Sequence, residues 1–223
     1  MSSLDHQKIE PSDFIEQQQR VIRDFCKRLD AHLPSYSYVP LKTDEQRVLV
    51  MQSRLFNELR AAEVFGAWLS STPDLEIKAH LAEACHEEIG HAKLLRQRIE
   101  GFGIEPFAYG PPPEQVALFH TMQNLESIAE RLAAFQLAGE AVAAHLIRRG
   151  LESEAVPEWI KAPYRRIIED EAEHGSEPAR MLERHGTTAE QQRLIRRGVA
   201  LGLSLRQRYF DALDDMVFKG LRW

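Results

Sequence analysis

Apolar residues in this chain recur every three or four positions, which is the spacing of one buried face of an α-helix. No segment shows the strict alternation of apolar and polar residues that marks a half-buried strand. In residues 44–70, for example, the apolar positions include Met51, Leu55, Ala61, Ala62, Phe65 and Leu69. The pattern therefore predicts an all-α protein.

Capping residues, prolines and glycines divide this pattern into six helices. Thr43 and Thr188 each stand three positions before a glutamine, which is the spacing of a capping box at a helix start. Gly101, Gly150 and Gly186 mark helix ends. The expected helices cover about 13–32, 44–70, 73–101, 113–150, 157 or 163 to 185, and 189–218.

The length of 223 residues suits a single domain, 1–223, with a substantial core. We expect residues 44–185 to form a four-helix core, preceded by an N-terminal helix and linker over 1–40 and followed by a C-terminal helix over 187–223. The core takes an up-down-down-up order if a crossover joins its second and third helices. The connection over 101–113 can span about 40 Å at roughly 3.3 Å per residue.

Each half of the expected core carries a glutamate within an apolar stripe and, one hairpin later, a Glu-x-x-His step. Glu58 stands 30 residues before Glu88, and Glu140 stands 31 residues before Glu171. The two halves match at offsets of 82 and 83 residues, which indicates an internal repeat. The recurring residues are Glu58, Glu88, His91, Glu140, Glu171 and His174.

Two physical arguments connect these residues. Residues three apart on a helix share a face, so the glutamate and histidine of each step can point at one site. A carboxylate on the buried face of a helix costs several kcal/mol unless another group compensates its charge. The glutamates also lie at heights that match within roughly one helical turn. We therefore expect the acidic side chains to meet inside the bundle.

This pattern resembles that of the ferritin-like di-iron carboxylate proteins, in which two helices each supply a Glu and two each supply a Glu-x-x-His. The resemblance covers 44–185 and implies a ferritin-like four-helix bundle with flanking N- and C-terminal helices. It also implies that all six residues are metal ligands, with Glu88 and Glu171 bridging the ions. Carboxylate and imidazole ligands suit two iron ions, or manganese with iron.

By the same resemblance, the chain is a non-haem di-iron oxygenase or oxidase that activates O2 to oxidise a small organic substrate. Such an enzyme needs an external electron donor, because the sequence has no Cys-x-x-Cys pair for a rubredoxin module. The alternative is ferritin-like metal storage or rubrerythrin-like peroxide reduction. An unpaired outer helix face would allow a homodimer.

Composition narrows the partners and the compartment. The formal net charge of −6 argues against a nucleic-acid partner, and no apolar run approaches a membrane span or a signal peptide. Cys26 and Cys85 have no metal or redox spacing, which suits free thiols in a cytoplasmic protein. The absence of a glycine-rich phosphate motif argues against a nucleotide or flavin cofactor.

Several alternatives stay open at the level of sequence. Glu63 rivals Glu58 as a ligand, because it also stands beside small residues. Gly139, next to Glu140, either leaves room for a substrate or only eases helix packing. Pro178 removes a hydrogen bond from the fourth helix, and the resulting kink either opens a cavity or has no functional role. The two Glu-x-x-His steps also fit surface ion pairs of a purely structural bundle.

Overall fold

The computed structural model describes the backbone of residues 9–174 and 177–222, and the side chains over the same ranges except 170–176. Over these residues the structure is helical without any strand, so the all-α prediction is confirmed. None of the helices described is both long and apolar enough to cross a membrane. The elements are α1 (Pro11–Ala31), η2 (Ser35–Ser37), α2 (Asp44–Leu69), α3 (Leu75–Glu100), α4 (Pro113–Gln123), α5 (Ile128–Arg131), η3 (Leu132–Glu140), α6 (Ala141–Glu152), α7 (Glu158–His174), α8 (Glu177–His185) and α9 (Ala189–Lys219).

Both predicted capping boxes are present at the starts of long helices. The Thr43 side chain accepts a hydrogen bond from the backbone N–H of Gln46 at the start of α2. The Thr188 side chain accepts one from the N–H of Gln191 at the start of α9. These bonds satisfy N–H groups that the first turn of a helix leaves without partners, which is why the two starts could be read from sequence.

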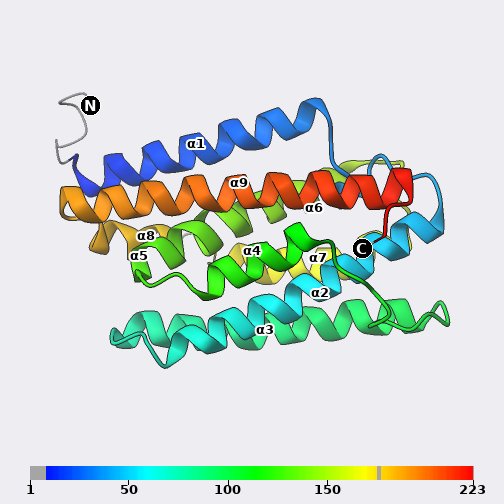
Figure 1. Cartoon of the computed structure of the whole chain (residues 1–223), viewed down its shortest axis with the longest axis horizontal. Helices are drawn as coiled ribbons and strands as arrows, with labels where there is room; N and C mark the ends of the chain where they lie inside the picture. The colour runs from blue at the N-terminus through cyan, green and yellow to red at the C-terminus, as the bar shows by residue number, and fades with distance from the viewer. Residues whose placement is uncertain (1–8, 175–176, 223) are drawn as a thin grey trace.

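The expectation of one helix over 113–150 is wrong. The chain forms α4, turns after Asn124, and then continues through α5, η3 and α6. Two hydrogen bonds hold the turn: Asn124 Nδ2 donates to the carbonyl of His120 (2.7 Å), and Arg131 Nε donates to the carbonyl of Leu125 (2.6 Å). The crossover therefore contains a helix as well as a linker, since α4 carries the chain back along the bundle (Figure 1).

The helices lie roughly along one axis in layers (Figure 1). The α2–α3 hairpin forms one side, α1 and α9 form the other, and α4, α6 and α7 lie between them. α3 and the α5–η3–α6 segment run in the same direction, whereas α2 and α7 run in the opposite direction. This arrangement brings residues from both halves of the chain to the middle of the bundle.

The C-terminal helix α9 is part of the core, although the sequence suggested a flanking position. It packs along η3, α4 and α5, and it buries Tyr209 and Phe210. Gly202 permits the close approach to η3, because a Cβ atom there would lie 2.3 Å from the carbonyl oxygen of Ala134. Side chains of α9 consequently reach the centre of the molecule.

Candidate metal centre

The α2–α3 hairpin brings three predicted ligands together. Glu58 of α2 and Glu88 and His91 of α3 each offer one ligand atom, and the three atoms lie within 4.8 Å of one another. Nδ1 of His91 is 3.7 Å from a carboxylate oxygen of Glu58 and 3.7 Å from one of Glu88. The exposed fractions of the Glu58 and His91 side chains are 13% and 4%, so the cluster lies inside the protein.

This geometry is close to that of a metal site. Bonds of about 2.1 Å would place two ligands of one ion no more than about 4.2 Å apart. Small side-chain rotations would bring the three atoms to that spacing. Carboxylate oxygens and an imidazole nitrogen are ligands that iron and manganese accept. The three residues could therefore hold a divalent cation.

The alternative ligand Glu63 does not reach this cluster. Its side chain is exposed and pairs with Arg60 on the same helix. The face of α2 that contacts α3 carries small residues instead, and the Cys85 thiol donates a hydrogen bond to the carbonyl of Ala62 (3.3 Å). The structure thus places Glu58, and not Glu63, between the two helices.

Glu140 approaches the same place from η3, which is a π-helix. Glu140 and Gln136 line a small cavity of about 20 Å³ together with Glu88, His91 and His80. The Gln136 side-chain amide donates a hydrogen bond to Nε2 of His80 (2.7 Å). π-Helices are rare and occur frequently at functional sites. Four of the six predicted ligands therefore surround one region of the core.

The remaining predicted ligands, Glu171 and His174, belong to α7. Their side chains lie outside the described residues. α7 packs against α3 and α6, and its Ile167 lines a cavity with Glu58 and Glu140. The assignment of Glu171 and His174 as ligands therefore stays a prediction.

Charges near the cluster favour an ionised Glu58. Burial raises the pKa of this carboxyl, but hydrogen bonds with Glu88 and His91 and the positive charge of Arg54 outweigh that effect and hold the pKa below its usual range. Arg54 is itself buried, and its guanidinium donates to the carbonyl of Tyr36 (2.9 Å) and stacks on the Tyr36 ring at 3.6 Å. A permanent cation thus stands beside the acidic site.

A second, larger cavity of about 80 Å³ adjoins the cluster, and Glu58, Glu88 and Glu140 are part of its wall. Much of the remaining wall is apolar and comes from α4, η3, α6 and α9, with Leu118, Phe119, Phe135, Ala143, Ile147 and Phe210. The volume exceeds the roughly 15 Å³ that one water molecule needs on this measure. The space could hold a small organic molecule in contact with the carboxylates.

One end of this cavity is polar and rigidly connected. The amide of Asn57 donates to the hydroxyls of Tyr36 (3.3 Å) and Tyr209 (3.2 Å), and the Tyr209 hydroxyl lies 2.7 Å from that of Ser53. Gln115 of α4 donates to Asn57 Oδ1 (2.7 Å). This network ties α2, α4 and α9 together around the cavity.

Several residues of the site could not be identified from sequence. Arg54, Tyr209 and Arg206 belong to helical stripes in which polar residues are usually solvated, and nothing in their spacing marks them as buried. His80 had a usable signal, because it precedes Glu88 by eight positions on a helix whose buried face also includes Leu81. A histidine on that face could have been added to the candidate site.

Comparison with known proteins gives a fold but no family. No family model matches the sequence, and no curated protein matches it. Among solved structures, a domain of unknown function with a heme oxygenase-like fold from Shewanella denitrificans OS217 is similar, with a TM-score of 0.71 and 14% sequence identity. The match covers 89% of this chain and 90% of that chain. The chain therefore shares the helical architecture of that domain.

Proposed function

We propose that this chain is a non-haem di-iron or manganese–iron oxygenase or oxidase that acts on a small organic molecule. The observation that carries the proposal is the convergence of Glu58, Glu88 and His91 within 4.8 Å inside the bundle, with Glu140 on the wall of the same cavities. The ferritin-like resemblance assigns Glu171 and His174 to complete the site. The helix directions in Figure 1 support that up-down-down-up arrangement.

The metal pair, when bound, supplies the redox chemistry: O2, two electrons from an external donor and two protons convert a substrate C–H bond to C–OH and release one water. The residues of this chain provide the environment. Glu58, Glu88 and Glu140 compensate the charge of two divalent cations in a buried site. The surrounding apolar side chains limit the access of water and hold the substrate beside the carboxylates.

A haem does not fit the described part of this site. Haem iron takes axial ligands such as His, Cys, Met or Tyr. Here the wall of the 80 Å³ cavity carries the carboxylates of Glu58, Glu88 and Glu140, which would repel the propionates of a porphyrin. The cavity also favours an oxygenase over metal storage, because storage requires no apolar space for an organic molecule.

Metal analysis of matched variants tests this proposal. Glu58→Ala removes a carboxylate from the cluster, whereas Glu63→Ala removes an exposed one from the same helix. We expect about two iron or manganese ions per chain in the wild type and in Glu63→Ala, and a sharp loss in Glu58→Ala. Equal metal content in the two variants would remove the proposed centre.

The kind of chemistry needs a second measurement. Ferrous protein is mixed with O2 or with hydrogen peroxide in the presence of a chemical reductant and candidate substrates, and the products are identified by mass spectrometry. Incorporation of an atom from ¹⁸O2 into an organic product supports an oxygenase. Rapid peroxide consumption without any organic product would favour the peroxide-reducing alternative, and accumulation of many ferric ions per chain would favour storage.

A further inference from the structure

Arg206 of α9 lines the 80 Å³ cavity and has no close anionic partner. Its guanidinium makes two long hydrogen bonds, to the carbonyls of Ala134 (3.4 Å) and Gly202 (3.5 Å). It forms no ion pair with any residue that the structure describes. Gly139 leaves the space for it, because a Cβ atom there would lie 1.8 Å from Nη2 of Arg206.

The surroundings of Arg206 leave much of its charge uncompensated. Burial lowers the pKa of this guanidinium to about 10 against the opposing effects of Tyr36 and Glu140, so the group stays charged at neutral pH. Arg54 differs, because its neighbours Tyr36, Tyr164 and Glu58 outweigh burial and raise its pKa. A buried charge without a partner is costly unless a ligand supplies the counter-charge.

We propose that Arg206 binds the carboxylate of the substrate, and that the substrate is a small organic acid with an apolar body. The planar guanidinium can donate two parallel hydrogen bonds to a carboxylate, which fixes the orientation of the acid as well as its position. The apolar body then lies among Phe119, Phe135 and Ile147, beside the carboxylates of the candidate metal centre. This inference rests on the proposed function.

A basic groove on the surface supports the same ligand class. The groove has a volume of about 510 Å³, lies between α1 and the η3–α6 segment, and includes Arg23, Lys27 and Arg148 in its wall. It shares Glu140 and Ala144 with the inner cavity, so it ends next to the candidate centre. In a chain with a net charge of −6, this local excess of positive charge attracts anions to the access route.

Calorimetric titration with straight-chain carboxylates from acetate to octanoate, and with the matching neutral amides, tests the proposal. It is carried out on metal-free protein and on protein loaded with ferrous iron under nitrogen. We expect at least one carboxylate to bind, and its amide to bind roughly 10- to 100-fold more weakly. Arg206→Gln should weaken carboxylate binding by the same factor and leave amide binding unchanged.

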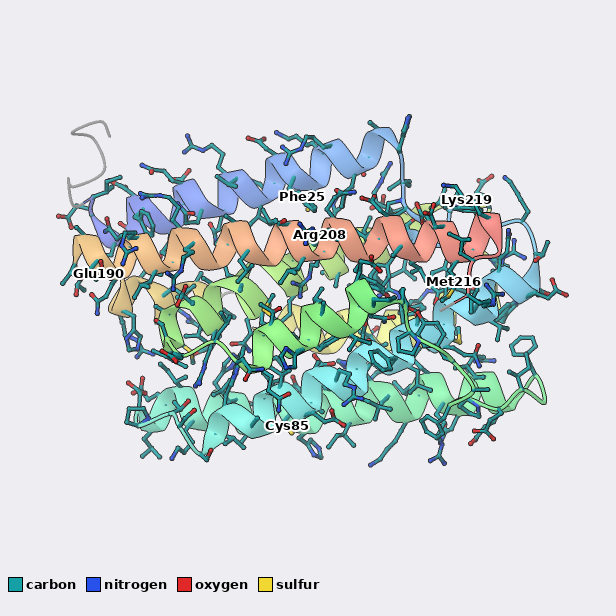
Figure 2. The ribbon with its side chains drawn as sticks, in the orientation of Figure 1. Phe25, Cys85, Glu190, Arg208, Met216 and Lys219 are labelled. Atoms are coloured by element: carbon teal, nitrogen blue, oxygen red, sulfur yellow. The ribbon has the colours of Figure 1, made fainter. Side chains whose placement is uncertain are left out.

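Arg208→Gln is the matched control, because Arg208 is exposed on the same helix (Figure 2). Its carboxylate affinity should equal that of the wild type. Gly139→Ala is a second variant that keeps the arginine but places a methyl group where its guanidinium lies, and it should also weaken carboxylate binding. Circular dichroism and the iron content of each variant show whether the fold and the metal site are retained.

The outcomes separate this inference from the proposed function. If the protein binds no metal but its carboxylate affinity depends on Arg206, the anion site stands and the oxygenase proposal fails. If metal binds and carboxylate affinity is the same in the wild type and Arg206→Gln, the anion site is wrong. Failure of every carboxylate in the series to bind the wild type would also overturn it.

Discussion

The side-chain amide of Gln136 donates a hydrogen bond to Nε2 of His80 across 2.7 Å, and this bond joins the π-helix η3 to α3. Both side chains are buried, with exposed fractions of 2% and 8%. The bond lies on the wall of the small cavity that Glu88, His91 and Glu140 also line. It therefore fixes the spacing of two helices that carry candidate ligands.

Gln136→Leu should lower the free energy of unfolding by about 1 kcal/mol, because it removes a hydrogen bond from a buried imidazole. Urea unfolding of the metal-free protein, followed by circular dichroism, measures the change. Gln17→Leu is the control, since Gln17 is exposed on α1 and its replacement should change stability by less than about 0.5 kcal/mol. Equal stabilities of the two variants would show that the Gln136 bond contributes nothing.

Ferrous iron should raise the melting temperature of the wild type, because a ligand that binds only the folded state stabilises it by mass action. At about 100 times the dissociation constant, the gain is about 2.7 kcal/mol. For a chain of this size that gain corresponds to a shift of roughly 5–10 °C. Scanning calorimetry under nitrogen should show the shift in Glu63→Ala and not in Glu58→Ala. A melting temperature that ignores iron in the wild type would contradict the candidate centre.

The Cys26 thiol should react slowly at neutral pH, because burial and the charge of Asp30 raise its pKa to about 11. At pH 8 only about one thousandth of such a thiol is ionised, and the thiolate is the reactive form. Iodoacetamide labelling of the Cys26 peptide, followed by mass spectrometry, should accelerate roughly tenfold per pH unit up to about pH 11. The same thiol in urea-unfolded protein should level off near its ordinary pKa of about 8.5. Similar rates for folded and unfolded chains at pH 8 would refute this.

The shift in Cys26 also has a sign for stability. The folded chain holds the thiol proton more tightly than the unfolded chain. This contribution is therefore fully present below the unfolded pKa of about 8.5 and is lost as the pH rises toward the folded value. Urea unfolding of Cys26→Ser should consequently show a weaker loss of stability between about pH 8.5 and 11 than the wild type.

Gly202→Ala should destabilise the protein by about 1–3 kcal/mol, because the new Cβ atom would lie 2.3 Å from the carbonyl oxygen of Ala134 and must push α9 away from η3. Gly110→Ala is the control, since a Cβ there meets no atom within 4 Å. Its effect should be neutral or slightly stabilising. Chemical denaturation of both variants measures the difference. Tolerance of Gly202→Ala would mean that the α9–η3 contact is loose.

Local signals in the sequence predicted much of this architecture. The capping boxes at Thr43 and Thr188 determine helix starts by bonds within four residues, so they are visible without any knowledge of the fold. Glu58 and Glu88 could be placed together because a carboxylate in an apolar stripe is costly and because the α2–α3 hairpin has a short turn. Distances along one hairpin are fixed largely by helix geometry.

Other features depend on contacts between distant segments and could not be predicted in this way. The turn after Asn124 and the π-helix η3 both depend on packing against α9, which begins more than sixty residues later. Arg206 looks like an ordinary surface arginine until Gly139 of another helix is placed against it. Periodicity of 3.6 residues also fails across η3, because a π-helix shifts the phase of the residues on either side of it.

The position of α9 has a consequence for the order in which the protein can be built. Arg206, Tyr209 and Phe210 are among the last residues to be synthesised, and they form one wall of the inner cavity. Until they arrive, the faces of α4 and η3 that they cover are open to solvent and prone to aggregate. A nascent or truncated chain that ends before residue 189 can therefore form its acidic hairpin, yet it cannot enclose a substrate.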